Sequence, residues 1–316
     1  MKTTQDCLPL FFGSRLPQSA FYHAHTLLLF TSDQILDTVV PGTAFSALAA
    51  KSGPVLDLPF QDTWTLLSRI PLISVWLWLL ILQACLQNQR SPTSLEEDLI
   101  NKPWRPIPSK RITRVQTEYL LASTYIVAGG ASHGLGTLPY WAVYVVLLIV
   151  YNELGGSDYS GTSRNIICGA AFSCYFGGAL SIALGPNISL SRKAIHWTFL
   201  LTCGVLATTF HTQDFRDEVG DRARDRRTLV TELGRRPALW TIAFCISFWS
   251  IYLPLGFFQG RWAVAAMPVT VGAWLVLTAV RAMELETQKF DRRMYKLWCL
   301  WIFGLCPLPL LSMAIG

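Results

Sequence analysis

The sequence is poor in charged residues. Asp, Glu, Lys and Arg make up 15% of its 316 positions, whereas soluble globular proteins usually carry about 25%. Hydrophobic residues make up 52%. This composition excludes a disordered chain and argues against an ordinary cytosolic enzyme. The net charge of +6 comes from loops between apolar segments, and no separate basic block indicates a nucleic-acid partner.

Cysteine pairs, linkers and repeats are also lacking. The eight cysteines form no CxxC pair and most lie in apolar runs, so small buried thiols are expected rather than disulfides or a zinc site. The first twenty residues hold Asp6 and Arg15 and no compact apolar core, so no removable signal peptide is predicted. No linker is long enough to separate two domains, and we expect a single domain over residues 1–316.

Long apolar segments make up most of the sequence. A membrane-spanning helix needs about 20 predominantly apolar residues. The apolar pattern is nearly continuous around each segment, as in helices surrounded by lipid and by one another. The first segment is short and is expected to extend back through Leu27–Phe30. The predicted fold is therefore all-α, a multi-pass membrane protein of about nine transmembrane helices. The nine segments are approximately 35–50, 64–87, 115–132, 138–154, 165–184, 195–211, 238–257, 262–283 and 296–315.

Loop charge predicts the orientation of these helices. With a cytosolic N-terminus, 21 of the 26 Lys and Arg residues fall on the cytosolic side and 5 on the other. One missed helix would place the following loops on the wrong side and remove this asymmetry of Lys and Arg. The asymmetry therefore supports a count of nine helices. Both long charged loops, between segments two and three and between segments six and seven, then lie on the cytosolic face.

The second charged loop carries acidic residues with helical spacing. On a helix continuing from segment six, its five acidic residues share an arc of about 100°. Such crowding is repulsive unless cations lie among the carboxylates, and Mg²⁺ prefers hard oxygen ligands. Arginines on the flanks of the arc suit phosphate oxygens. A solvated, salt-bridged surface helix is the alternative. The acidic residues are Asp214, Asp217, Glu218, Asp221 and Asp225.

The first charged loop places three acidic residues, Glu96-Glu97-Asp98, before a basic stretch. Pro103, Pro106 and Pro108 forbid a regular helix there. Alone, this pattern is also typical of a solvated turn. Two acidic clusters on the same face could hold a diphosphate through bridging Mg²⁺.

The wording of the two loops resembles the UbiA superfamily of intramembrane prenyltransferases. The first loop reads Asn88…Asp98-x-x-Asn101-Lys102-Pro103-x-Arg105-Pro106, and the second Asp214-x-x-Asp217-x-x-x-Asp221. The resemblance implies nine membrane helices around a central cavity that binds an isoprenyl diphosphate through Mg²⁺. The usual first motif is N-x-x-x-D-x-x-x-D, and this chain departs from it, because Pro92 and Glu96 occupy the aspartate positions. The departure argues against ordinary aromatic or quinone prenylation. The residues Asn-Gln…Glu-Asp…Asn-Lys-Pro-Trp-Arg-Pro in the first loop and His-Thr-Gln-Asp-Phe-Arg-Asp-Glu in the second resemble the fungal branch, which includes membrane-bound terpene cyclases.

The resemblance implies roles for individual residues. Asp98, with Glu96 or Glu97, would replace the first aspartate pair. The expected catalytic residues are Asp214, Asp217, Asp221, Asn88 and Asp98. The expected Mg²⁺ ligands are Asp214, Asp217, Asp221, Asn88, Glu97 and Asp98. The expected diphosphate ligands are Lys102, Arg105, Arg164 and Arg222.

Further candidates lie at the cytosolic ends of the helices. Aromatic faces stabilise carbocations, although membrane aromatics more often serve packing. His211 is a candidate proton acceptor, with a structural histidine as the alternative. The expected pocket residues are Tyr119, Tyr151, Asn152, Tyr175 and Tyr252, with Trp249 and Glu153 nearby.

The expected activity is that of a Mg²⁺-dependent membrane terpene cyclase, which ionises a farnesyl or geranylgeranyl diphosphate and cyclises the cation. Prenyl transfer to an aromatic or other acceptor is the alternative. A cation transporter is a distant third, because charge is nearly absent from the membrane midplane. The expected partners are the polyprenyl diphosphate, the lipid bilayer and downstream biosynthetic enzymes. For a eukaryotic chain the endoplasmic reticulum is the expected location, with the mouth of the site in the cytosol.

Overall fold

The computed structural model describes residues 16–315, and the side chains from residue 19. Helices account for all the regular structure of the described chain. The helices of the first half are Leu16–Thr31 (α1), the π-helix Ile35–Val39 (η1), Val40–Lys51 (α2), Gly53–Leu56 (η2), Thr63–Gln89 (α3), Pro92–Asn101 (α4), Arg114–Gly134 (α5), Leu138–Asn152 (α6) and Gly156–Tyr159 (α7).

The second half continues without strands in the described residues. Its helices are Gly161–Leu184 (α8), Arg192–Phe199 (α9), the π-helix Leu200–Leu206 (η3), Ala207–Thr209 (α10), the 3₁₀ turn Phe210–Gln213 (η4), Asp214–Ala223 (α11), Leu229–Leu233 (α12), Arg235–Ile251 (α13), the π-helix Tyr252–Phe257 (η5), Trp262–Ala282 (α14), Gln288–Leu305 (α15) and Leu308–Ile315 (α16).

Each of the nine apolar segments predicted from the sequence is helical. By length and composition, four of the described helices are able to cross a membrane: α3, α8, α13 with η5, and α14. The bent pair α15 and α16 forms a fifth candidate, with an angle of 45° between its halves. The bend falls at Pro307, which lacks the N–H that would continue the helix. The all-helical class is confirmed, whereas nine membrane crossings stay a prediction.

Two expected helix boundaries are wrong. The first segment does not extend back through Leu27–Phe30 as one helix, because α1 ends at Thr31 and a turn separates it from η1. Nor does an unbroken α-helix continue from segment six, since four residues of 3₁₀ helix, η4, lie between α10 and α11. Asp225 lies beyond the end of α11 in a left-handed conformation, with φ of 54°, and therefore does not share the acidic arc.

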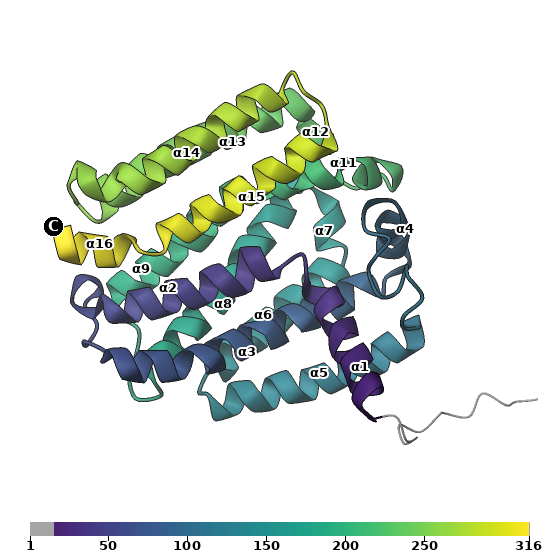
Figure 1. The fold of residues 1–316 in the computed structure, drawn as a ribbon, viewed down its shortest axis with the longest axis horizontal. Helices are drawn as coiled ribbons and strands as arrows, with labels where there is room; N and C mark the ends of the chain where they lie inside the picture. The colour runs from purple at the N-terminus through teal and green to yellow at the C-terminus, as the bar shows by residue number, and fades with distance from the viewer. Residues whose placement is uncertain (1–15, 316) are drawn as a thin grey trace, which may run out of the picture.

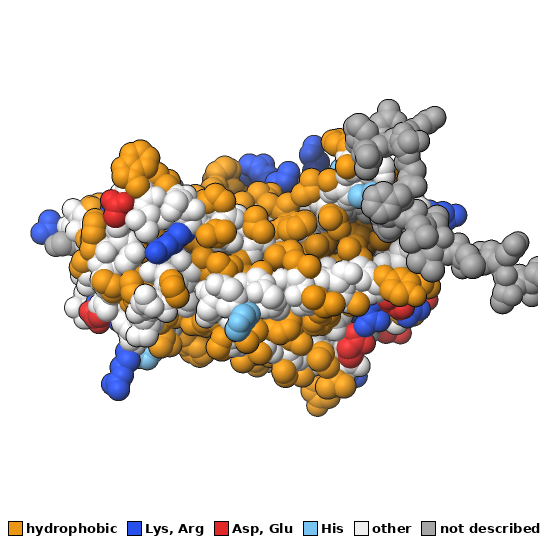
Figure 2. Space-filling view, turned by 90° about the horizontal axis from the view of Figure 1, so that it is seen from below, with side chains coloured by type: hydrophobic (Ala, Val, Ile, Leu, Met, Phe, Trp, Pro, Cys, Tyr) orange, Lys and Arg blue, Asp and Glu red, His pale blue; other side chains and the backbone are white. Residues whose placement is uncertain are grey.

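The helices are arranged so that the charged loops meet at one end. In Figure 1 the long helices run approximately side by side, and α4, α7, α11 and α12 gather at the right-hand end. Figure 2 shows hydrophobic side chains spread over the middle of one face, with charged side chains mainly toward the ends. An apolar belt with charged ends is typical of a helical bundle in a bilayer.

Local sequence explains how two of these elements are positioned. Ser160 caps α8, because its hydroxyl accepts a hydrogen bond from the Ser163 N–H while its own N–H donates to the Ser163 hydroxyl. Arg164 therefore lies in the first turn. Within the bundle, α8 packs against α3, and a Cβ at Gly178 would lie 2.3 Å from the Trp76 ring. Only glycine permits this approach. The packed helices leave a cavity between them at the charged end.

Candidate active site

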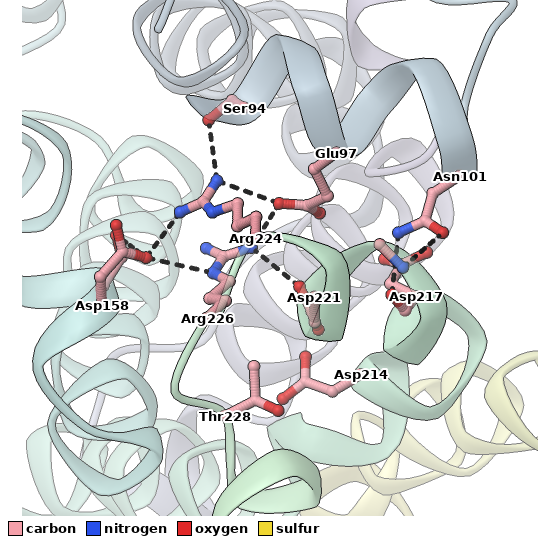
Figure 3. Close-up of polar contacts among 12 residues, drawn as sticks. Ser94, Glu97, Asn101, Asp158, Asp214, Asp217, Asp221, Arg224, Arg226 and Thr228 are labelled. Carbon is pink, nitrogen blue, oxygen red and sulfur yellow. Dashed lines mark hydrogen bonds and ion pairs between the residues drawn. The ribbon is translucent and has the colours of Figure 1, made fainter. Parts of the chain in front are cut away.

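The first contact between the two charged loops is made by α4 and α11. Asn101 at the end of α4 donates to the Asp217 carbonyl at 2.8 Å and accepts from the Gly220 N–H at 3.2 Å. A Cβ at Gly220 would lie 2.3 Å from the Asn101 side-chain nitrogen, so this position requires glycine. Figure 3 shows Asn101 directed at α11. Residues separated by more than 100 positions in sequence are thus held side by side.

Lys102 forms a second link between the loops. Its ammonium lies 2.7 Å from the Asp217 carboxylate, and both side chains are largely buried. Arg216 lies 3.6 Å from the same carboxylate. Burial alone would raise the pKa of Asp217, but Lys102 and Arg216 outweigh it and lower that pKa to about 2. Asp217 is therefore a carboxylate at physiological pH.

Glu97, one helical turn before Asn101 in sequence, joins a larger ionic network. Its carboxylate lies 3.1 Å from Arg224 and 3.2 Å from Arg226, which both approach Asp158 in turn. Figure 3 shows the two arginines between α4, α7 and α11. Of the two glutamates that the sequence left open, Glu97 is buried and Glu96 is exposed. Glu97 is therefore the member that faces the site.

Asp221 lies on the same side of α11 as this network but is poorly compensated. Arg226 is 3.5 Å away, and the Oδ1 atom of Asp221 is buried without a hydrogen-bond partner. Burial and the nearby Asp214 carboxylate raise the pKa of Asp221 to about 7. This part of the site holds more negative charge than the protein neutralises.

Arg105 and Arg164 are each held by a buried aspartate. The Arg105 guanidinium donates to both Asp98 oxygens, at 2.7 and 3.0 Å, and to Asp33 at 3.1 Å. The Arg164 guanidinium donates to both Asp214 oxygens, at 2.6 and 2.5 Å. Asp98 and Asp214 are each 1% exposed, so they lie behind the arginines that they orient.

These side chains surround a cavity of about 150 Å³. Five cationic side chains line it: Lys102, Arg105, Arg164, Arg216 and Arg226. The Nε atoms of Arg105, Arg216 and Arg226 are buried without a hydrogen-bond partner. Unused N–H donors beside an enclosed space suit a polyanion, because each phosphate oxygen accepts several hydrogen bonds.

The rest of the cavity is apolar and aromatic. Its lining includes Tyr144, Tyr151, Phe172, Tyr175 and Phe210. The Tyr175 hydroxyl donates to the Tyr144 hydroxyl at 2.9 Å, which donates to the Leu80 carbonyl at 2.8 Å. The hydroxyl groups of these two tyrosines are therefore satisfied within the protein, and what they add to the cavity is aromatic surface. One cavity thus combines a charged part with an aromatic part. The ionic mouth is the part lined by Lys102, Arg105, Arg164, Arg216 and Arg226, and the aromatic wall is the part lined by Tyr144, Tyr151, Phe172, Tyr175 and Phe210.

Most of the residues expected at the site do lie there. Asn88 lines the cavity and donates to Asn152 at 3.1 Å. The other expected residues in the cavity wall are Glu97, Lys102, Arg105, Tyr151, Asn152, Arg164, Tyr175 and Asp217. Asp98, Asp214 and Asp221 contact this wall through Arg105, Arg164 and Arg226.

Several expected residues lie elsewhere. Arg222 is on the outer side of α11, where it pairs with Glu218 one turn away. Tyr119 is 73% exposed on α5, and Tyr252 stacks on Phe248 at the surface of the bundle. Trp249 donates to Thr208 and does not line the cavity. These positions are near the predicted helix ends, but the side chains point away from the cavity.

His211 and Glu153 also fall outside the cavity wall. One ring nitrogen of His211 lies 3.3 Å from the Asn165 side chain and the other 2.9 Å from Thr241. Both ring nitrogens are used in hydrogen bonds to neighbouring helices, so His211 is a structural histidine. Glu153 pairs with Arg90 on a partly exposed surface.

Sequence reasoning missed four charged residues of the cavity wall: Asp33, Asp37, Arg216 and Arg226. Asp33 and Asp37 stand at the start of the first apolar segment. Charge so close to a membrane helix is costly and commonly functional, and this signal could have identified them. Arg216 and Arg226 belong to the second charged loop, but nothing in the spacing separates them from Arg222.

The residues at the mouth fit the chemistry that Mg²⁺ requires. The metal prefers carboxylate and carbonyl oxygens, and often shares them with substrate phosphates. No three acidic, histidine or cysteine side chains of the described chain are already gathered around one point. The unpartnered Asp221 oxygen nevertheless lies where negative charge is in excess. A divalent cation there would relieve that excess.

Comparison with known proteins shows what the chain is similar to. The chain is 29% identical over 243 residues to fumagillin beta-trans-bergamotene synthase of Aspergillus fumigatus, covering 76% of this chain and 80% of that one. It is 30% identical over 281 residues to polyprenyl transferase eriF of Hericium erinaceus, covering 86% and 90%. Among solved structures, a UbiA homologue from Archaeoglobus fulgidus bound to GPP and Mg²⁺ has a TM-score of 0.63 at 11% identity, covering 90% of this chain and 99% of that one.

At 11% identity, the likeness to the solved structure shows a shared fold and no more. The family match is more direct, because the profile of the UbiA prenyltransferase family matches residues 39–300. The named relatives are a terpene synthase and a prenyltransferase, both of them enzymes. The chain is an enzyme that belongs to the UbiA prenyltransferase family.

Proposed function

We propose that the protein is a Mg²⁺-dependent membrane terpene cyclase. It binds a polyprenyl diphosphate, farnesyl or geranylgeranyl, with the diphosphate at the ionic mouth and the chain along the aromatic wall. The observation that carries the proposal is the single cavity that joins five cationic side chains to a wall of tyrosines and phenylalanines. The mouth faces the cytosol, and the apolar helices lie in the bilayer.

Charge at the mouth supports cleavage of the carbon–oxygen bond. Negative charge develops on the departing diphosphate, and preorganised guanidinium and ammonium groups stabilise it. Mg²⁺, when bound, neutralises further charge on the leaving group as a Lewis acid. Asn88, Glu97, Asp217 and Asp221 would hold the metal, and Lys102, Arg105, Arg164, Arg216 and Arg226 would hold the phosphate oxygens. Asp98 and Asp214 keep two of these arginines in place.

The aromatic wall supports cyclisation of the cation that is left. Tyr144, Phe172 and Tyr175 line the cavity, and the quadrupole of an aromatic ring stabilises a carbocation at its face. The same wall excludes water, which would otherwise quench the cation as an alcohol. The substrate's own double bonds are then the nearest nucleophiles. Similarity to a fungal terpene synthase favours this outcome, whereas similarity to a polyprenyl transferase keeps transfer to an acceptor as the alternative.

The two reactions are separated by their need for an acceptor. Purified protein in detergent is incubated with farnesyl or geranylgeranyl diphosphate and Mg²⁺. We expect diphosphate release and a volatile hydrocarbon without any acceptor, and neither product in EDTA. Inertness until an aromatic acceptor is added would refute cyclisation in favour of transfer. Asp225→Asn is the matched control for site variants, because Asp225 is exposed and lies beyond α11.

A further inference from the structure

Cyclisation to a hydrocarbon ends with the loss of a proton, so the cavity needs a group that accepts one. The expected candidate, His211, is unsuitable, because both of its ring nitrogens are engaged outside the cavity wall. Three carboxylates of the cavity wall, Asp33, Glu97 and Asp217, are paired with lysine or arginine, and Asp221 is a proposed metal ligand. A carboxyl group of the cavity wall without an ion-pair partner is the better candidate.

Asp37 is such a group. It lies on the π-helix η1, one turn beyond Asp33, is 3% exposed, and lines the cavity. One of its oxygens accepts a hydrogen bond from the Thr38 hydroxyl at 2.9 Å, and the other accepts one from the Tyr295 hydroxyl at 2.8 Å. Tyr295 is fixed in turn by the Arg216 guanidinium, 3.8 Å above its ring. The carboxyl group is thus held in position by neutral donors.

The other acidic groups of the cavity wall, unlike Asp37, are each paired with a lysine or arginine. Asp33 lies 3.1 Å from Arg105, Glu97 3.2 Å from Arg226, and Asp217 2.7 Å from Lys102. Within residues 16–315, no lysine or arginine nitrogen lies within 4.0 Å of Asp37. A buried carboxyl group without an ion-pair partner is costly, and its presence in a membrane bundle indicates use.

The bonding capacity of Asp37 is also incomplete. A carboxylate has about four acceptor positions, and the two hydroxyls occupy two of them. The remaining acceptor positions can take up a proton from a molecule bound in the cavity. Cys85, Asn88 and Tyr144 line the same cavity as Asp37, so Asp37 shares it with the aromatic wall.

We propose that Asp37 is the proton acceptor of the cyclisation. This inference rests on the proposed function. The carbon–oxygen bond breaks and its electron pair leaves with diphosphate. Double-bond electrons close a ring and move the positive charge. A carbon–hydrogen bond beside the final cationic carbon then breaks, its electrons form the new double bond, and the proton passes to Asp37. Diphosphate and a neutral hydrocarbon leave, and Asp37 returns its proton to water at the mouth.

The test is the product composition of Asp37→Asn, measured per diphosphate released. We expect the ratio of hydrocarbon to water-quenched alcohol to fall at least tenfold. Asp33→Asn is the matched control, because Asp33 lines the same cavity but is paired with Arg105. It should lower turnover without changing this ratio. A wild-type ratio in Asp37→Asn would overturn the proposal, since a merely structural role changes stability and rate only.

A second variant covers the case in which Asp37→Asn fails to fold. Asp37→Glu keeps the carboxylate but displaces it by one methylene. The ratio of double-bond isomers in the hydrocarbon product should therefore change. An unchanged isomer ratio in folded Asp37→Glu would overturn the assignment. Failure of the proposed function has a different signature, because wild-type protein would then release no diphosphate or form no hydrocarbon.

Discussion

Asp217 and Asp221 lie one turn apart on α11 and have opposite electrostatic surroundings. Asp217 contacts Lys102 and Arg216, which hold its pKa at about 2 despite burial. Asp221 is buried beside Asp214 with one oxygen unpaired, and its pKa rises to about 7. The protein neutralises one half of the mouth itself and leaves the other half in need of a cation. We infer that added Mg²⁺ lowers the energy most on the Asp221 side.

Loss of either aspartate should have the largest effect on turnover. Asp217→Asn and Asp221→Asn should each lower kcat/KM for diphosphate release by about 100- to 1,000-fold, the usual loss when one electrostatic contact to the leaving group disappears. The measurement is released diphosphate at saturating Mg²⁺. Asp225→Asn should stay within about twofold of wild type, as expected of a surface residue. Full turnover by Asp217→Asn would contradict the site.

The two substitutions should differ in stability. Asp217→Asn leaves Lys102 buried without its partner, which costs about 3 kcal/mol in the free energy of unfolding. Asp221→Asn removes repulsion with Asp214, so the metal-free protein should be no less stable than wild type at pH 7.5. Thermal unfolding of both variants in EDTA measures the difference. Equal destabilisation by the two would remove the contrast between the halves.

The contact between the loops is open to a steric test. Gly220→Ala places a methyl group where Asn101 now packs, and should cost about 1–3 kcal/mol while separating α4 from α11. Diphosphate release should fall with it. Gly234→Ala is a useful comparison, because Gly234 has open space around it but a positive φ of 83°, so its cost is conformational and lies away from the loop contact. Wild-type turnover in folded Gly220→Ala would show that the contact is dispensable.

The pH dependence of stability should be smaller but has a definite sign. Asp221 binds its proton more tightly in the fold than in the unfolded chain, where its pKa is about 3.9. Its contribution is therefore full below pH 4 and is lost as the pH rises toward 7. The Tm of metal-free protein should fall between pH 5 and 7.5, and Mg²⁺ should restore it at pH 7.5. Asp221→Asn should flatten this decline. A Tm that rises over the same interval in wild type but not in Asp221→Asn would contradict the raised pKa.

The sequence predicts the elements of the site better than their facing directions. The proline-stiffened stretch after Asn101 is non-helical as expected, and the two charged loops do meet. The spacing of the acidic residues predicts the angles between their side chains on α11, but not which face of α11 is turned toward the cavity. That choice depends on the 3₁₀ turn before Asp214 and on contacts with α4, so Arg216 faces inward and Arg222 outward. The sequence does not predict the surroundings of Asp37, because its hydrogen-bond partner Tyr295 is more than 250 residues away in sequence.

A structure with a non-hydrolysable farnesyl thiodiphosphate and Mg²⁺ would test most directly whether both loops bind one ligand. We predict diphosphate oxygens in contact with Lys102 and Arg226, metal density beside Asp221, and the prenyl chain against Tyr144 and Tyr175. Diphosphate bound by one loop alone, or a prenyl chain outside this cavity, would contradict the proposal.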